Sequence, residues 1–120
     1  MRSVLIALST SLLALVVASG ASAASVDGMN VYSTSTGSGK ATVVLVHGWT
    51  CDSSSWDAQV PVLSKHYRVI TLDLPGHGRS GAPEDRDSYS PSRIRADLLQ
   101  IVFDAGARSS DRALFASFAI

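Results

Sequence analysis

Two short loops of this sequence carry residue types that could stabilise an anion while a bond is cleaved. The first reads His47-Gly48-Trp49, and the second, residues 73–80, reads Asp-Leu-Pro-Gly-His-Gly-Arg-Ser. A strand that ends in a glycine turn can point backbone N–H groups into a crevice, where they stabilise the negative oxygen that forms when a carbonyl carbon is attacked. The two loops therefore predict one half of a hydrolytic site.

The nucleophile that would attack the carbonyl is not evident in the sequence. The 120 residues contain no Gly-x-Ser-x-Gly, in which small flanking residues allow the sharp turn that a reactive serine needs. Ser117 is the candidate nucleophile by its place in the chain. Phe115 and Ala119 stand where the two glycines are needed, and a phenylalanine there is expected to clash, so the sequence argues against Ser117.

Three other side chains could exchange a proton or attack a substrate. His47 and His77 are considered as bases because imidazole is the usual proton acceptor near neutral pH, but support of their loops is the simpler role. Cys51, the only cysteine, has no visible base partner. The three histidines of the chain lack close spacing and Cys or Asp partners, so we expect no metal and no cofactor.

Residues 76–81 form a competing pattern, Gly-x-Gly-x-x-Gly, which is typical of dinucleotide-binding folds when it follows a strand. That reading would indicate an oxidoreductase. The pattern should turn directly into a helix whose N-terminus meets the pyrophosphate, whereas Ala82 and Pro83 interrupt it here. An oxidoreductase is therefore the less favoured alternative.

Two buried strands and a helical connection are expected to hold the two loops. Residues 42–46 have the continuous β-branched and apolar pattern of a strand buried on both faces, and residues 67–72 give a second strand. The serines at 53–55 offer N-cap oxygens to a helix between them, and Pro61 should kink that helix or start a second one. Such a βαβ unit places a crevice beyond the carboxyl ends of its strands, where both loops lie.

A hairpin and a further helix flank this unit. Asp27-Gly28 is a turn signal between a short segment at 25–26 and a strand at 29–34. Ser90 and Pro91 can begin a helix that Gly106 ends. Its apolar stripe consists of Ile94, Leu98, Ile101, Val102 and Ala105. Its polar side, expected to be solvated, consists of Arg93, Asp97, Gln100 and Asp104.

The two ends of the chain have patterns of their own. Arg2, a long apolar run and small residues at 21–23 predict a signal peptide at residues 1–23, and hence a secreted or periplasmic protein. Residues 24–106 then form the folded α/β part. Residues 107–120 are expected to be an irregular tail that could be out of register, as in a frameshifted gene product.

Charge and composition narrow the class of partner. Ten Lys and Arg residues balance ten Asp and Glu residues, and neither sign forms a long run. This pattern does not suggest nucleic acid or an anionic membrane as a partner. We expect a small, neutral, ester-like molecule as substrate, and no membrane association beyond the signal peptide.

The two loops and their strands resemble the N-terminal part of the α/β-hydrolase family, over about residues 29–106. The resemblance rests on Val43-Val44-Leu45-Val46-His47-Gly48-Trp49, Trp56, Leu63, residues 67–70 and residues 73–80. It implies an incomplete α/β-hydrolase sheet, made of a hairpin, a βαβ unit and a following helix. It also implies that the N–H of Trp49 contributes to an oxyanion hole, that Gly48 leaves space, and that His47 supports the loop.

The resemblance also implies an activity, because complete members of this family are esterases, lipases and similar enzymes in which a serine attacks an ester-like carbonyl. The acid and the histidine that follow this serine in the family are absent from the sequence, so we expect the chain by itself to be inactive. Thr50 stands where epoxide hydrolases of the family usually carry proline, which argues against that branch.

Two hypotheses from other classes remain. The chain could be a non-catalytic fragment, in which the strand at 42–46 would lose a neighbour and expose an apolar edge. It could also be a binding module that keeps the crevice without the chemistry.

Overall fold

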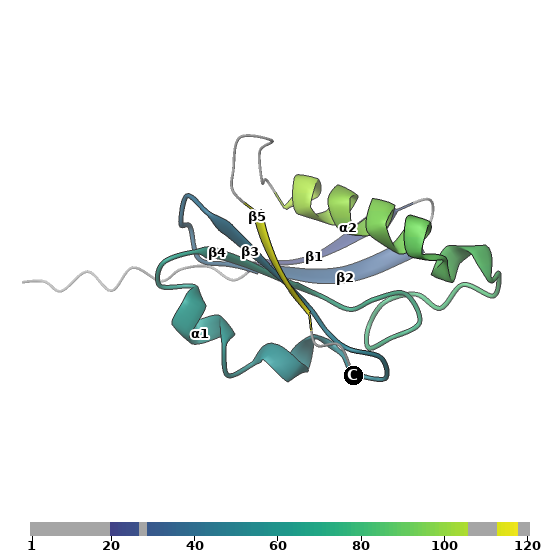
Figure 1. Ribbon diagram of the computed structural model, residues 1–120, viewed down its shortest axis with the longest axis horizontal. Helices are drawn as coiled ribbons and strands as arrows, with labels where there is room; N and C mark the ends of the chain where they lie inside the picture. Colours follow the sequence, from purple (N-terminus) through teal and green to yellow (C-terminus); the bar gives the residue numbers. More distant parts are fainter. Residues whose placement is uncertain (1–19, 27–28, 106–112, 118–120) are drawn as a thin grey trace, which may run out of the picture.

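The computed structural model describes residues 20–26, 29–105 and 113–117, and for 21–26 and 113–117 it describes only the backbone. In this part of the chain a five-stranded sheet has the order β1-β2-β4-β3-β5 (Figure 1). The strands are β1 (Gly20–Val26), β2 (Met29–Thr36), β3 (Thr42–Val46), β4 (Arg68–Leu72) and β5 (Ala113–Ser117). β3 is parallel to β4 and β5, whereas β2 is antiparallel to β1 and β4. The α/β class is as the sequence predicts.

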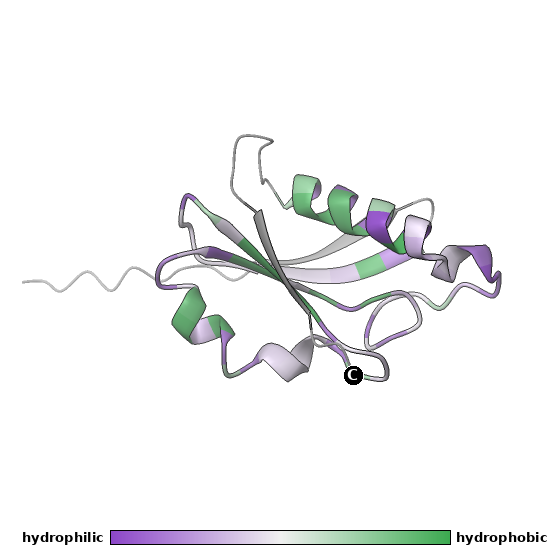
Figure 2. Cartoon of the chain, in the orientation of Figure 1, coloured by the Kyte–Doolittle hydropathy of each residue, from purple (hydrophilic) through white to green (hydrophobic). Residues whose placement is uncertain are grey.

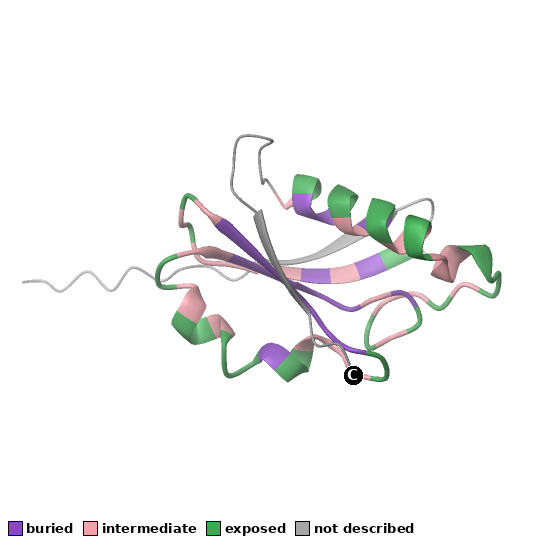
Figure 3. Cartoon of the chain, viewed as in Figure 1, coloured by how far each residue is buried: buried purple, intermediate pink, exposed green. Residues whose placement is uncertain are grey.

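The central strands β3 and β4 are apolar and buried (Figures 2 and 3). Every residue of β3 is buried, and so are residues 69–72 of β4. Their Val, Ile, Leu and Thr side chains suit a strand with cores on both sides, because branched side chains pack well on a pleated surface. The two predicted strands are confirmed, and β4 begins one residue later than predicted, at Arg68.

Helices cover both faces of the sheet. α2 (Pro91–Asp104) lies over one face, and η1 (Ser53–Trp56) and α1 (Val60–Leu63) lie over the other (Figure 1). Since successive side chains of a strand point to opposite faces, β3 and β4 contribute to two cores. The buried core under α2 consists of Val31, Val44, Val46, Ile70, Leu72, Ile101 and Val102. The buried core under η1 and α1 consists of Val43, Leu45, Trp56 and Val69.

The connection from β3 to β4 contains two short helices. Pro61 lies in the first turn of α1, where a missing backbone N–H costs little. Of the two predicted outcomes, a kinked helix or the start of a second helix, the structure shows the second. The cap of η1 is Asp52 and not one of the serines that follow it. Its backbone is extended, and its Oδ1 accepts hydrogen bonds from the backbone N–H and the hydroxyl of Ser54 at 2.8 and 2.5 Å.

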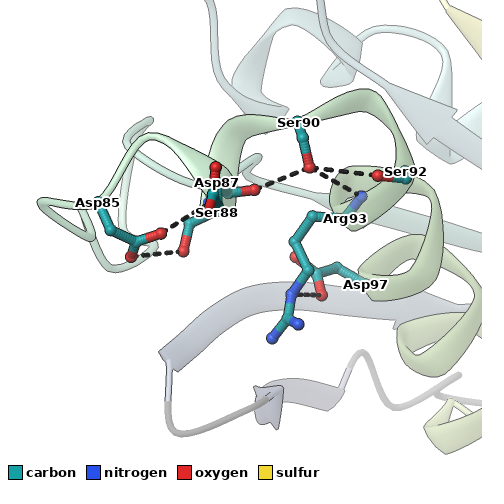
Figure 4. Close-up of polar contacts among 7 residues, drawn as sticks. All are labelled: Asp85, Asp87, Ser88, Ser90, Ser92, Arg93 and Asp97. Carbon is teal, nitrogen blue, oxygen red and sulfur yellow. Dashed lines mark hydrogen bonds and ion pairs between the residues drawn. The ribbon is translucent and has the colours of Figure 1, made fainter.

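The helix α2 begins as predicted, with Ser90 as its cap. The Ser90 hydroxyl accepts from the N–H of Arg93 at 3.4 Å and donates to the carbonyl of Asp87 at 2.8 Å (Figure 4). The predicted end at Gly106 lies outside the described residues, and the described helix ends at Asp104.

The expected solvation of Asp97 is wrong, because only 2% of this residue is exposed. Asp97 lies one turn before Ile101, which is in the core under α2, so both belong to the inward stripe of the helix. Arg93 Nε lies 3.5 Å from Asp97 Oδ1 (Figure 4). Burial raises the pKa of Asp97, and the charge of Arg93 opposes that shift.

The predicted hairpin is confirmed, but its first strand is longer than expected. β1 pairs with β2 from Gly20 opposite Ser35 to Val26 opposite Met29. Residues 20–24 are Gly, Ala and Ser, which have no strand pattern, so their pairing with β2 specifies this part of the strand. The predicted signal peptide otherwise lies outside the described residues.

The expectation that 107–120 is irregular is wrong for Ala113–Ser117, which forms β5. This strand pairs with β3 from Thr42 opposite Ala113 to Val46 opposite Ser117. A short apolar run is sufficient for a strand when a buried neighbour offers its unpaired backbone groups. β5 therefore covers the edge of β3 that the fragment hypothesis left exposed.

The described helices are all too short or too polar to cross a membrane.

Candidate active site

The two candidate loops lie where the chain reverses its direction across the sheet. From β3 the chain crosses by η1 and α1 to β4, and from β4 it returns by α2 past β3 to β5. Such a reversal opens a crevice beyond the carboxyl ends of the strands, because the two connections diverge to opposite faces. β3 ends at Val46 and β4 at Leu72, so both loops begin at this crevice.

A tight turn at residues 48–51 follows β3. The N–H of Cys51 donates to the carbonyl of Gly48 at 3.2 Å. Thr50 has φ 66°, and it is the one non-glycine residue with a positive φ in the described ranges. A positive φ at the third position alone is typical of a type II turn, where glycine or asparagine is usual. Proline could not stand at position 50 of this turn, because its φ is confined to about −65°.

His47 ties this turn to the loop that follows β4. It is buried, and its Nε2 accepts the N–H of Leu74 at 2.9 Å, so Nε2 carries no proton. The proton of the neutral ring is then on Nδ1, which donates to the carbonyl of Gly48 at 2.8 Å. These two hydrogen bonds join the turn to the loop that follows β4 and leave no ring nitrogen free to act as a base.

His77 makes the same kind of bridge in the opposite direction. Its Nε2 accepts the N–H of Thr50 at 3.3 Å, and its Nδ1 lies 2.9 Å from the carbonyl of Pro75 and donates to it. The rings of His47 and His77 lie side by side, with centroids 5.1 Å apart. Each loop therefore contributes one imidazole that holds a backbone N–H of the other loop.

The carboxylate of Asp73, the first residue of the second loop, joins this loop to the start of η1. Only 1% of it is exposed, and its carboxylate accepts the N–H of Ser53 at 2.7 Å and that of Arg79 at 2.8 Å. Gly78 has φ 50°, and a Cβ on it would lie 2.3 Å from Asp73 Oδ2. Glycine is required here both for the backbone conformation and for the close approach of the carboxylate.

The rest of this loop folds back on itself. The hydroxyl of Ser80 donates to the carbonyl of Asp73 at 2.5 Å and accepts the N–H of Tyr32 at 2.9 Å. The N–H of Gly76 donates to the carbonyl of Gly81 at 2.8 Å. No helix begins at these glycines, and the next helical segment is η2 (Asp87–Tyr89), so the geometry opposes a dinucleotide site.

An open crevice of about 470 Å³ lies between the two loops. It is lined by Trp49, Thr50, Cys51, Asp52, Pro75, Gly76, His77, Gly78, Ala82 and Tyr89. The Trp49 indole is 71% exposed and rests edge-on against His77, with ring centroids 5.2 Å apart. The backbone N–H of Trp49 donates to no described residue.

Ser117 is the last residue of β5 and stands opposite Val46, one residue before His47. The structure therefore brings its backbone to the same edge of the sheet as the two loops. Its side chain and residues 118–120 lie outside the description, so the weak candidacy of Ser117 as a nucleophile stays a prediction.

A second hollow, of about 540 Å³, lies beside η1 and includes Tyr32, Asp52 and Arg79 in its lining. Two hydrogen bonds from Ser54 lower the pKa of Asp52, and the bond from the Ser54 side chain has a larger effect than the bond from its backbone. The Arg79 guanidinium stacks over the Tyr32 ring at 4.4 Å. Across the described ranges no group of three His, Cys, Asp or Glu side chains could hold a metal ion.

The hydrogen bond from the Thr50 N–H to His77 could not be predicted from the sequence. Neither residue belongs to a helical or alternating pattern, and the contact joins residues 27 positions apart. The one available signal is that each loop contains a His-Gly pair, His47-Gly48 and His77-Gly78.

This chain is similar to known proteins in sequence and in structure. A family model described as "alpha/beta hydrolase fold" matches residues 41–107, more than half of the chain. Over 84 residues the chain is 49% identical to the pimeloyl-[acyl-carrier protein] methyl ester esterase of Edwardsiella ictaluri, covering 70% of this chain and 29% of that protein. Over 77 residues it is 35% identical to an epoxide hydrolase of Caballeronia sordidicola, covering 63% of this chain and 23% of that protein.

The solved structures agree with this relationship. The crystal structure of epoxide hydrolase A from Mycobacterium thermoresistibile matches with a TM-score of 0.73 and 31% identity, over 83% of this chain and 31% of that chain. The chain therefore spans less than a third of the length of these relatives. From its sequence, its sheet and its two loops, this chain belongs to the α/β-hydrolase family.

Proposed function

We propose that this chain supplies the oxyanion-binding part of a hydrolase that cleaves ester-like bonds. The observation that carries the proposal is the N–H of Trp49, which has no described acceptor and lies in a turn that His47 and His77 both hold. When a nucleophile attacks a carbonyl carbon, negative charge develops on the carbonyl oxygen. A backbone N–H held in place stabilises that charge without any reorganisation during the reaction.

The ester branch is favoured over the epoxide branch by the turn itself. The relatives include both an esterase and epoxide hydrolases. Thr50 has φ 66°, a value that the proline usual in the epoxide branch could not adopt. The turn therefore has a different backbone from one that carries proline at this position.

We further propose that the 120 residues by themselves do not hydrolyse esters. The sequence has no Gly-x-Ser-x-Gly, and both histidines at the crevice have both ring nitrogens engaged. The purified chain should hydrolyse p-nitrophenyl butyrate no faster than buffer does. Turnover that Ser117→Ala abolishes would overturn this proposal.

The oxyanion role is tested by a substitution that removes one N–H. Trp49→Pro deletes the N–H, and proline suits the second position of a type II turn, so the turn should persist. Trp49→Phe keeps the N–H and an aromatic ring, and serves as the matched control. The ligand is phenyl methylphosphonate, a stable monoanion whose tetrahedral phosphorus carries the charged oxygen of the attacked state.

Titration of the ¹⁵N-labelled chain with this anion should shift the amide resonance of Trp49. Binding should persist in Trp49→Phe and be lost in Trp49→Pro. Since Trp49→Pro has no amide resonance at position 49, binding to this variant is monitored through the Gly48 and Cys51 amides. Equal binding by the two variants would show that the N–H does not hold the anion.

We also propose that residues 1–23 direct export and that the mature chain acts outside the cytoplasm. The support is the sequence pattern alone. Cleavage after Ala23 would leave residues 24–26 of β1 paired with residues 29–31 of β2, which is close to the hairpin predicted from the sequence. The intact mass of the expressed protein in the exported fraction tests this, and an uncleaved chain confined to the cytoplasm would refute it.

A further inference from the structure

The turn that carries the Trp49 amide contains a residue in an unfavourable conformation. Thr50 is β-branched, and at φ 66° its Cβ crowds the backbone, so the residue tends to leave this conformation unless something retains it. The turn hydrogen bond from Cys51 to Gly48 measures 3.2 Å, at the upper end of the usual range. Contacts from outside the turn must therefore contribute to its shape.

The outside contact on Thr50 is His77. Its Nε2 accepts the Thr50 N–H at 3.3 Å, while the bond from Nδ1 to the carbonyl of Pro75 sets the tautomer that leaves Nε2 free to accept. The same ring is 5.2 Å from the Trp49 indole and 5.1 Å from the His47 ring. His77 therefore touches the turn at two successive residues.

We propose that His77 is the positioning residue that retains Thr50 in its left-handed conformation and thereby the shape of the turn that carries the Trp49 amide. The catalytic meaning of this role rests on the proposed oxyanion function, but the role itself concerns the free protein. His77 acts through the turn and does not touch the reacting atoms. Release of the Thr50 N–H would free the peptide unit that joins Trp49 to Thr50. This unit adjoins the one that carries the Trp49 N–H, whose carbonyl, that of Gly48, is held by His47 and Cys51.

The test compares two substitutions of His77. His77→Phe keeps a flat ring against Trp49 but removes the acceptor, whereas His77→Gln keeps an acceptor at about the distance of Nε2. His66→Phe is the matched control, because His66 is an exposed histidine that does not line the crevice. Far-UV circular dichroism and the denaturation midpoint verify that each variant is folded.

The first readout is hydrogen exchange of the Thr50 amide, measured by NMR without any ligand. Exchange should be about fivefold faster in His77→Phe, the effect expected from the loss of one hydrogen bond. His77→Gln should restore most of the protection, and His66→Phe should leave it unchanged.

The second readout separates positioning from general stability. Glycine adopts a positive φ without strain, so Thr50→Gly should retain the turn even when the acceptor is missing. The Trp49 amide resonance should move in His77→Phe and return close to its original position in the double variant His77→Phe/Thr50→Gly. A purely structural loss caused by His77→Phe would not be reversed by a second substitution in the turn.

The outcomes distinguish this proposal from the oxyanion proposal. If Trp49→Pro still binds the anion, the oxyanion function fails while the exchange result for Thr50 still decides the role of His77. Unchanged exchange and an unchanged Trp49 amide in His77→Phe would overturn the positioning role. If His77→Phe does not fold, the test uses His77→Phe/Thr50→Gly and His77→Gln. A Trp49 amide resonance that is displaced from its original position equally in these two variants would overturn the positioning role.

Discussion

Replacement of Asp73 by asparagine should destabilise the chain by about 3 kcal/mol, because this carboxylate joins the start of η1 to the loop that follows β4. Each of its oxygens accepts one backbone N–H, from Ser53 at 2.7 Å and from Arg79 at 2.8 Å, and only 1% of the residue is exposed. A hydrogen bond to a charged group contributes about 1.5–3 kcal/mol. Asparagine would lose one of the two bonds, turn its NH₂ toward a backbone N–H and weaken the other bond.

Equilibrium denaturation with urea measures this change, and thermal unfolding should show a lower midpoint by more than about 10 °C for a chain of this size. Asp85→Asn is the matched control. Asp85 also accepts two hydrogen bonds, from the N–H and the hydroxyl of Ser88 at 2.9 and 2.8 Å (Figure 4), but this residue is exposed. Water replaces the lost bonds at an exposed site, so Asp85→Asn should leave the midpoint unchanged.

The reasoning would be refuted if Asp73→Asn and Asp85→Asn had the same denaturation midpoint. That result would mean that the two backbone N–H groups find other partners at no cost. A change in the slope of the denaturation curve without a change in its midpoint would instead indicate an altered unfolded state.

Three further predictions concern stability and its pH dependence. Gly78→Ala should lower the free energy of unfolding, measured with urea, by about 2–4 kcal/mol, because alanine is strained at φ 50° and its Cβ would meet the Asp73 carboxylate. Gly20→Ala is the control, because its added Cβ meets nothing within 4 Å. An equal change in the two variants would contradict the prediction. Ile70→Ala should cost about 2–5 kcal/mol, whereas Val62→Ala, at a residue 61% exposed, should cost little, and similar denaturation midpoints would argue against the core. Because burial raises the pKa of Asp97 in the folded state, the folded state binds a proton more readily than the unfolded state. The buried charge therefore destabilises the folded state at neutral pH, and this cost disappears as the pH falls through the raised pKa. Asp97→Asn should therefore raise the denaturation midpoint at pH 7, by an amount that shrinks as the pH approaches the ordinary value of 3.8, and a gain independent of pH would refute the assignment.

The parts of the fold that follow a local pattern could be predicted from the sequence. β3 was recognisable from a continuous apolar run, and the start of α2 from Ser90 followed by Pro91. The position of both loops at the crevice follows from the ends of β3 and β4. In each case the information lies within a few neighbouring residues.

The parts that depend on a distant partner could not be predicted. The first half of β1 is made of small residues, and it is a strand because β2 pairs with it. β5 likewise forms beside β3 from a run too short to be distinctive. Asp97 was assigned to the solvent by its charge, although its position one turn before Ile101 places it inside. Residue type and helical position conflicted there, and position decided.

The candidate site shows the same limit in its chemistry. Each imidazole holds a backbone N–H, of Leu74 or of Thr50, so the side chains of the donor residues take no part in the bond. A residue at position 74 or 50 could therefore change while the bond persists, whereas His47 and His77 could not be replaced by a side chain without an acceptor.

Because the bonds run in opposite directions between the loops, loss of either ring leaves the loops joined by the other. The turn at residues 48–51 would be affected in both cases, since His47 also contacts the carbonyl of Gly48 and His77 holds the N–H of Thr50. The shape of the turn that carries the Trp49 amide is thus a property of the two loops together.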